Sequence, residues 1–191
     1  MPPDHPAPDR AALRRDLLVA RERFVQSPAA AAAAQALQAH LDALLARLEP
    51  ACLGVYWPMR SEFNAARRWC ADQGQAAPAL ALPCALRAPP SMHYRAWDGG
   101  TPAARDEFHL PTGDGPRVIP DVVLVPCVGV TDDGYRLGYG GGFFDRYLAA
   151  HPDTTAVGVA WSVGRLAPGQ FTPEPHDQPL MLVVTEAGIV G

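Results

Sequence analysis

Apolar side chains recur every three or four residues through the first quarter of the chain, which is the spacing of one helix face. This pattern predicts an amphipathic helix over residues 10–24, with Asp9 as its N-cap and an arginine-rich outer face. Ser27 as N-cap and Pro28 at the first helical position predict a second helix, which continues through an alanine tract to Leu48.

Beyond Pro50 the pattern changes to short apolar runs that alternate with short helical segments. Several of the runs are continuously Val- and Leu-rich, which is typical of strands buried on both faces. We therefore expect an α/β fold: a single three-layer α/β/α domain over residues 1–191, with a mostly parallel central sheet and a disordered tail at 1–8. The predicted strands are 51–57, 79–86, 92–97, 121–130, 154–161 and 180–186, and the predicted helices are 64–72 and 143–151.

Composition narrows the function classes. The 191 residues carry a formal net charge of −4, which disfavours a nucleic-acid partner. All 16 cationic side chains are arginine, so Schiff-base and P-loop lysine chemistry are excluded. The four cysteines form no C-x-x-C pair and predict reduced core thiols. With no signal-like or membrane-spanning run, we expect a cytoplasmic protein with no membrane partner.

The most informative segment is rich in glycine and connects a predicted buried strand to the helix over 143–151. Glycines allow a backbone with positive φ that leaves amides uncovered, and a helix N-terminus adds further free amides and a positive dipole end. Arg136 and Arg146 flank this anion cradle and could bind phosphate, while Asp145 could hold a divalent cation. The glycines are Gly138, Gly140, Gly141 and Gly142.

Two common nucleotide motifs are absent from this segment. A dinucleotide fingerprint requires glycine where Phe143 stands, and a Walker loop requires Gly-Lys followed by Ser or Thr. The alternative to a phosphate site is a tight turn between solvated arginines.

A second cluster, residues 56–64, lies where a predicted strand ends, and ligands of open α/β sheets gather at such ends. Glu62 could accept hydrogen bonds from a heterocycle, or it could only complement a helix dipole. Met59 and Trp57 could pack against a flat ring or belong to the core.

Two further groups carry charge. His176 and Asp177 lie in a proline-bracketed loop before the last predicted strand. The stiff loop could hold the Asp177 carboxylate in position for function, or the two residues could be an ordinary surface pair. Arg10 and Arg14 share one helix face. They could be exposed to solvent, or they could bind a polyanion if that helix folds back over the glycine segment. The remaining histidines have no partner spacing, so a zinc site is not expected.

The segment 125–148, VPCVGVTDDGYRLGYGGGFFDRYL, resembles the signature of the 5-formyltetrahydrofolate cyclo-ligase (methenyltetrahydrofolate synthetase) family. The resemblance extends to R-x-x-L-R at 10–14, Y-x-P-M-x-x-E at 56–62, G-V-A-W at 158–161 and P-H-D-x-P-L at 175–180. It implies a cytoplasmic enzyme of one-carbon metabolism that uses ATP and Mg²⁺ to cyclise 5-formyltetrahydrofolate to 5,10-methenyltetrahydrofolate, releasing ADP and phosphate. Phosphorylating the formyl oxygen makes it a leaving group, so no protein nucleophile is needed.

The resemblance also implies roles for individual residues. Arg136 and Asp145 would be catalytic, and Asp145 with Asp177 would hold Mg²⁺. Met59, Glu62 and the stretch Tyr139–Phe143 would contact the folate. The ATP-binding set would be Arg10, Arg14, Arg136, Leu137, Gly138, Tyr139, Gly140, Gly141, Gly142, Phe143 and Phe144.

The chain departs from the family pattern at Arg10 and Gly141, where many members carry lysine, and at Phe143 and Phe144, where tyrosine is frequent. Two other functions remain open: a non-catalytic folate or nucleotide binder, and a sugar-phosphate isomerase or CoA-transferase-like enzyme, because those families have a similar three-layer fold. We expect the protein to be a monomer whose partners are small-molecule substrates, ATP and a reduced folate.

Overall fold

The computed structural model describes residues 9–68 and 78–190. The predicted disordered tail at 1–8, Cys70 and the last part of the predicted helix 64–72 lie outside these residues. Within the described part, no helix is both long and apolar enough to cross a bilayer.

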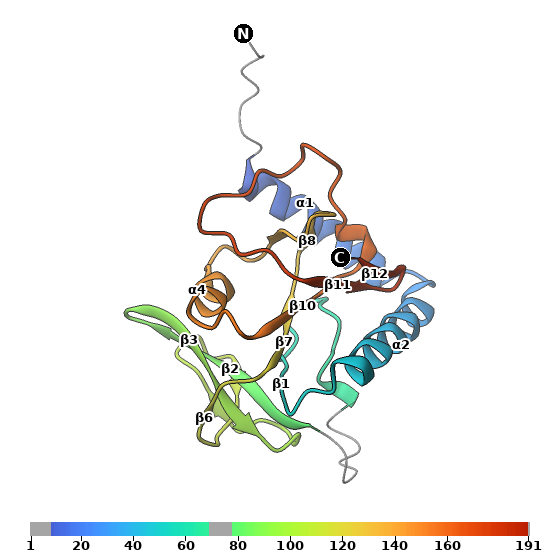
Figure 1. Cartoon of the computed structure of the whole chain (residues 1–191). Helices are drawn as coiled ribbons and strands as arrows, with labels where there is room; N and C mark the ends of the chain where they lie inside the picture. The colour runs from blue at the N-terminus through green and yellow to red at the C-terminus, as the bar shows by residue number, and fades with distance from the viewer. Residues whose placement is uncertain (1–8, 69–77, 191) are drawn as a thin grey trace.

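An eight-stranded mixed sheet forms the centre of the molecule, in the order β12-β11-β10-β7-β1-β2-β3-β6 (Figure 1). The five strands from β11 to β2 run parallel, whereas β12, β3 and β6 are antiparallel to their neighbours. The mostly parallel sheet is therefore confirmed. Its strands are β1 (Cys52–Gly54), β2 (Ala79–Arg87), β3 (Pro90–Trp97), β6 (Arg117–Val118), β7 (Val122–Pro126), β10 (Thr155–Val159), β11 (Leu182–Thr185) and β12 (Gly188–Val190).

Helices cover both faces of this sheet. Alternate side chains of β7 divide between two cores: Leu124 faces the leucines of α2 (Ala30–Leu48), and Val123 faces the side of α4 (Phe143–Ala150). Figure 1 shows α2 and α4 on opposite sides of the sheet, with α1 (Arg10–Val25) across the end near β8. This alternation on continuously apolar strands produces the three layers.

The first helix begins as predicted, because the Asp9 carboxylate accepts a hydrogen bond from the Ala11 amide. The predicted start of the second helix was wrong. Ser27 and Pro28 lie in a turn, and α2 begins at Ala30 without a side-chain cap. The intervening residues bend the chain between the two helices, and the Ser27 carbonyl accepts from the Ala30 amide.

The predicted strand over 121–130 is broken in two. β7 ends at Pro126, and the chain then forms β8 (Gly129–Val130), which pairs with β9 (Arg136–Leu137) in a separate hairpin. An apolar run alone does not show this break, since both pieces are buried. The hairpin carries the glycine-rich segment away from the sheet. A further small hairpin is made by β4 (Ala104–Arg105) and β5 (Pro111–Thr112), and a 3-10 turn, η1, covers Ser162–Gly164.

The α2 face of the sheet should dominate stability. Leu41 is 1% exposed, whereas Leu48 lies half-buried at the end of the same helix. We expect Leu41→Ala to lower the free energy of unfolding by about 2–5 kcal/mol, since it leaves a cavity, and Leu48→Ala to cost clearly less. Urea unfolding of both variants measures the difference. Equal losses would contradict the placement of this core.

Candidate functional site

A cleft of 710 Å³ opens at the carboxyl ends of the parallel strands. Residues after β1 and β7 form two of its walls, and β1 and β7 are neighbours in the sheet. This is the edge where open α/β sheets bind ligands. Every residue of the predicted ATP, folate and metal sets lines this one cleft.

The glycine loop, residues 138–142, joins β9 to α4. Gly140 and Gly142 have φ values of 93° and 61°, a region that L side chains rarely adopt. Among the described residues, the amides of 138–142 have no hydrogen-bond acceptor. Gly142 is also the N-cap of α4 and offers no side-chain oxygen to the first turn. The loop thus presents free N–H groups and a positive helix end toward the cleft, which suits an anion.

Helix α1 does fold back over the glycine loop. The Arg14 Nε donates to the carbonyl of Gly138 at 2.6 Å, and its guanidinium lies against Gly140, where an added Cβ would be 3.4 Å from it. The condition under which the Arg10/Arg14 pair gains a binding role is therefore met.

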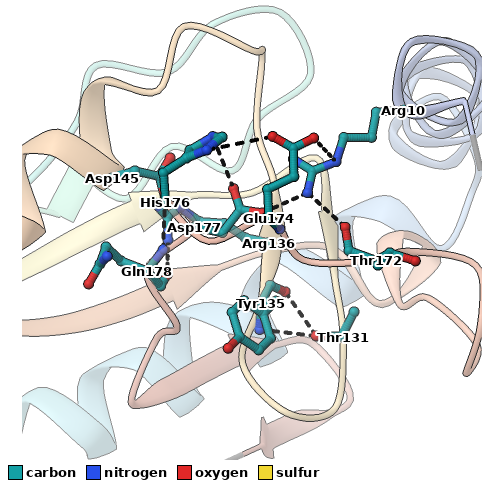
Figure 2. A network of polar contacts seen from close by, with 10 residues as sticks. All are labelled: Arg10, Thr131, Tyr135, Arg136, Asp145, Thr172, Glu174, His176, Asp177 and Gln178. Carbon is teal, nitrogen blue, oxygen red and sulfur yellow. Dashed lines mark hydrogen bonds and ion pairs between the residues drawn. The ribbon is translucent and has the colours of Figure 1, made fainter. Parts of the chain in front are cut away.

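Arg136 is buried beneath the loop and joins two segments. Its NH2 donates to Asp145 Oδ1 at 2.6 Å, and its NH1 donates to the Gln178 carbonyl at 2.5 Å. Asp145 Oδ1 also accepts from the Gln178 amide. Figure 2 shows these three residues together. Arg136 therefore already has protein partners, and it fixes α4 to the 174–178 loop.

Arg10 links α1 to the 174–178 loop. Its NH2 donates to Asp177 Oδ2 at 2.6 Å and to the Thr172 carbonyl, and its Nε lies 3.4 Å from Glu174 (Figure 2). Burial alone would raise the pKa of Asp177, but Arg10 and the Glu174 amide hold that pKa below its ordinary value. Asp177 is thus a placed, ionised carboxylate, whereas His176 beside it is exposed.

Glu62 ends a tight turn rather than beginning a helix, which corrects the helix-dipole interpretation. Its Oε2 accepts from the Met59 amide at 2.7 Å, and Arg60 within the turn has a φ of 54°. Glu62 Oε1 is buried without a hydrogen-bond partner among the described residues. Burial raises the pKa of Glu62, and the Met59 amide opposes the rise only in part. A buried acceptor with no donor is costly unless a ligand supplies one.

The turn is continuous with an apolar wall. Trp57 and Met59 line the cleft, and Trp57 makes an edge contact with Trp97 at 6.2 Å. On the opposite side, Phe143 contacts Phe108 edge-on at 5.2 Å. The Phe143 ring also lies over Gly141, where an added Cβ would approach its carbons to 2.8 Å.

Sequence reasoning missed three residues here. Phe108 and Asp106 come from the loop between β4 and β5, and Asp106 accepts from the amides of Ala85, Phe108 and Leu110. Arg21 lies behind the cleft at 2% exposure. No motif marked the first two. The third lies seven residues after Arg14, a spacing that returns to the same helix face.

The carboxylates of Asp145 and Asp177 fit a cation that takes the rest of its ligands from phosphate and water. In the described residues no three His, Cys, Asp or Glu side chains form a metal cluster. Asp145 Oδ2 has no protein partner among the described residues, and Asp177 Oδ1 has only His176 at 3.8 Å. Mg²⁺ often takes one or two carboxylates and completes its shell with water and substrate phosphates.

The other histidines and the cysteines agree with the structural roles expected of them where the structure describes them. His40 and His151 contact backbone carbonyls of Thr185 and Tyr147. Cys84 and Cys127 are buried free thiols, and Cys52 is half-buried.

The Arg136–Asp145 pair should stabilise the fold. We expect Arg136→Met to lower the free energy of unfolding by about 3–5 kcal/mol, because it leaves the Asp145 charge largely buried and unpaired. The matched control is Arg165→Met, which removes an ion pair with Asp132 that is more than half exposed on both sides and should change little. Chemical denaturation measures the free energy of unfolding of both variants. Similar small losses in the two variants would contradict a stabilising role of the Arg136–Asp145 pair.

A protein-family model matches most of the chain, and two curated relatives match about a third of it. A model of the 5-formyltetrahydrofolate cyclo-ligase family covers residues 6–186. A 5-formyltetrahydrofolate cyclo-ligase of Mycoplasma pneumoniae is 37% identical over 67 residues, 35% of this chain and 39% of the relative. One of Mycolicibacterium smegmatis is 41% identical over 71 residues, 37% of this chain and 36% of the relative. These alignments thus span less than half of either relative.

Solved structures agree in fold. A 5,10-methenyltetrahydrofolate synthetase of Mycoplasma pneumoniae superposes with a TM-score of 0.70 at 20% identity, covering 93% of this chain and 99% of that one. The synthetase of Aquifex aeolicus gives a TM-score of 0.74 at 21% identity, covering 95% and 91%. Since the family model extends over nearly the whole of it, this chain belongs to the 5-formyltetrahydrofolate cyclo-ligase family.

Proposed function

We propose that the protein uses ATP to cyclise 5-formyltetrahydrofolate to 5,10-methenyltetrahydrofolate, with release of ADP and phosphate. One observation carries the proposal: a single cleft is lined both by a loop of free amides and by a buried carboxylate whose Oε1 has no hydrogen-bond partner among the described residues. The first feature suits phosphate and the second suits a heterocycle with N–H donors.

The chemistry requires positioning more than a protein nucleophile. The formyl oxygen attacks the γ-phosphorus of ATP, ADP departs, and the side-chain nitrogen of the folate then attacks the activated formyl carbon. That nitrogen loses its proton, and phosphate leaves with the former formyl oxygen. Holding the two substrates in line and neutralising phosphate charge account for most of the rate enhancement in such reactions.

The nucleotide half would be the glycine loop with α1 above it. Amides of 138–142 and the N-terminus of α4 would contact the phosphates, and Arg14 at the loop would add positive charge. Arg10 lies at the same rim through its link to Asp177. Arg136 contributes from beneath, because its bonds to Asp145 and Gln178 fix the loop's surroundings.

The folate half would be the 59–62 turn and its apolar wall. The pterin ring carries amino and ring N–H groups, and Glu62 Oε1 is a buried acceptor that lacks such a donor. Trp57 and Met59 offer flat apolar surface beside it. The ring would therefore be oriented by one charge-assisted hydrogen bond and by stacking.

Asp145 and Asp177 would hold Mg²⁺, each through the carboxylate oxygen that does not bind an arginine. When bound, the ion would neutralise charge on the transferring phosphoryl group. Arg10 and Arg136 fix the two carboxylates in place, each through a hydrogen bond to one carboxylate oxygen.

The deciding experiment mixes the protein with 5-formyltetrahydrofolate, ATP and Mg²⁺ and follows the near-ultraviolet absorbance of the methenyl product. We expect product with the unmodified chain, and a loss of turnover with a raised Mg²⁺ requirement in Asp145→Asn. Asp132→Asn, in an exposed pair on the β8–β9 turn, is the control. No product at high enzyme concentration would reject the catalytic assignment, and retained folate and ATP binding would then indicate a binder.

Folate binding should depend on pH through Glu62. Its pKa is raised by burial, so the carboxylate becomes protonated at a higher pH than an exposed glutamate would. We expect affinity to be full above that pKa and to fall as the pH drops through it, because a protonated carboxyl is a poorer acceptor. Glu62→Gln should bind more weakly, with a flat profile over this range. Tryptophan fluorescence reports binding, and Glu22→Gln on exposed α1 surface is the control.

A further inference from the structure

Arg21 is a buried cation without a carboxylate partner. It is 2% exposed, and no Asp or Glu of the described residues lies within 4.0 Å of its guanidinium. A buried charge is costly unless hydrogen bonds compensate it. Arg21 finds this compensation in two hydroxyl groups: its Nε donates to Ser61 Oγ at 3.2 Å and its NH2 to the Tyr139 hydroxyl oxygen at 2.6 Å.

These two partners belong to two different segments that line the cleft. Ser61 belongs to the turn that presents Glu62, and its carbonyl accepts from the Trp161 indole at 3.0 Å. Tyr139 belongs to the glycine loop, and its ring lies 5.8 Å from the Arg21 guanidinium. Tyr139 and Glu62 line the cleft, while Arg21 does not. The guanidinium therefore joins both segments from behind.

The hydrogen bond from Arg21 to Tyr139 also limits where the hydroxyl hydrogen of Tyr139 can point. Because the hydroxyl oxygen accepts from Arg21, the hydroxyl hydrogen remains free to be donated within the cleft that Tyr139 and Glu62 both line. Among the described residues, the groups that interact electrostatically or by hydrogen bonds with the Glu62 carboxylate are Tyr139, the Arg21 cation, the Met59 amide, the Tyr56 hydroxyl and the Cys127 thiol. Arg21 is the one positive charge in this set.

We infer that Arg21 is a positioning residue for the folate half of the site, which acts through Tyr139 and Ser61 to hold the Glu62 carboxylate in place and to stabilise its negative charge. The inference rests on the proposed function, since it assumes that Glu62 contacts the folate. It assigns no contact between Arg21 and either substrate. Removing Arg21 should therefore affect folate recognition and leave nucleotide recognition largely unchanged.

The test compares Arg21→Met with Arg23→Met, an exposed arginine on the same helix. Binding of 5-formyltetrahydrofolate is followed by tryptophan fluorescence over a range of pH, and the KM for ATP is measured separately. We expect Arg21→Met to weaken folate binding about tenfold or more, the effect of one lost charge-assisted hydrogen bond, and to change the ATP KM less than about twofold. The pH midpoint of folate binding should rise, since Arg21 lowers the pKa of Glu62.

Two further variants separate positioning from loss of fold. Arg21→Lys retains the cation, so the pH midpoint should return toward the original value even if affinity does not. Tyr139→Phe cuts the connection without removing the buried charge, and in it folate binding should weaken and the pH midpoint should also rise. Tyr139→Phe provides the test if Arg21→Met does not fold, as judged by thermal unfolding.

The outcomes distinguish this inference from the function beneath it. An unmodified protein that binds no folate would reject the proposed function. A protein that binds folate, with the same affinity and pH midpoint in Arg21→Met or in Tyr139→Phe, would overturn the role of Arg21 alone. Equal weakening of folate and ATP binding would also overturn it, because a general loss of structure explains that result.

Discussion

The arrangement of the cleft depends on the arginines of one helix, which contact a loop made mostly of glycine. Arg14 of α1 binds the Gly138 carbonyl, and Arg10 binds Asp177 in the adjoining loop. A glycine-rich chain loses much conformational entropy when it is ordered. Contacts from a preformed helix offset part of that cost, so the amides can remain free for a ligand.

The arginines around the cleft are compensated by different kinds of group. Arg10 and Arg136 each pair with a carboxylate, that of Asp177 and that of Asp145. Arg21, in contrast, is compensated by hydroxyl groups and leaves the nearby Glu62 unpaired. Because interactions between charges strengthen as water is excluded, small displacements of these side chains carry large effects. The fold keeps them in place by joining α1, the glycine loop and the 174–178 loop.

The sequence permitted much of this to be predicted, for reasons that are visible in particular residues. The glycine loop and its flanking charges are contiguous, and the amphipathic period of α1 showed that Arg10 and Arg14 share a face. The division of 121–130 into β7 and β8 could not be predicted, since both pieces are apolar and only tertiary pairing distinguishes them. The role of Arg21 could not be predicted, because its partner Ser61 lies in a turn forty residues later in the chain.

The packing of Phe143 has a consequence for how this sequence can change over evolution. The ring occupies the space that a side chain at Gly141 would need, and it in turn rests on Phe108 from a distant hairpin. A larger residue at 141 would have to displace the ring, and the displaced ring would lose its neighbour at 108. The lysine that many family members carry at position 141 would therefore require the ring at 143 to lie elsewhere than it does in this chain.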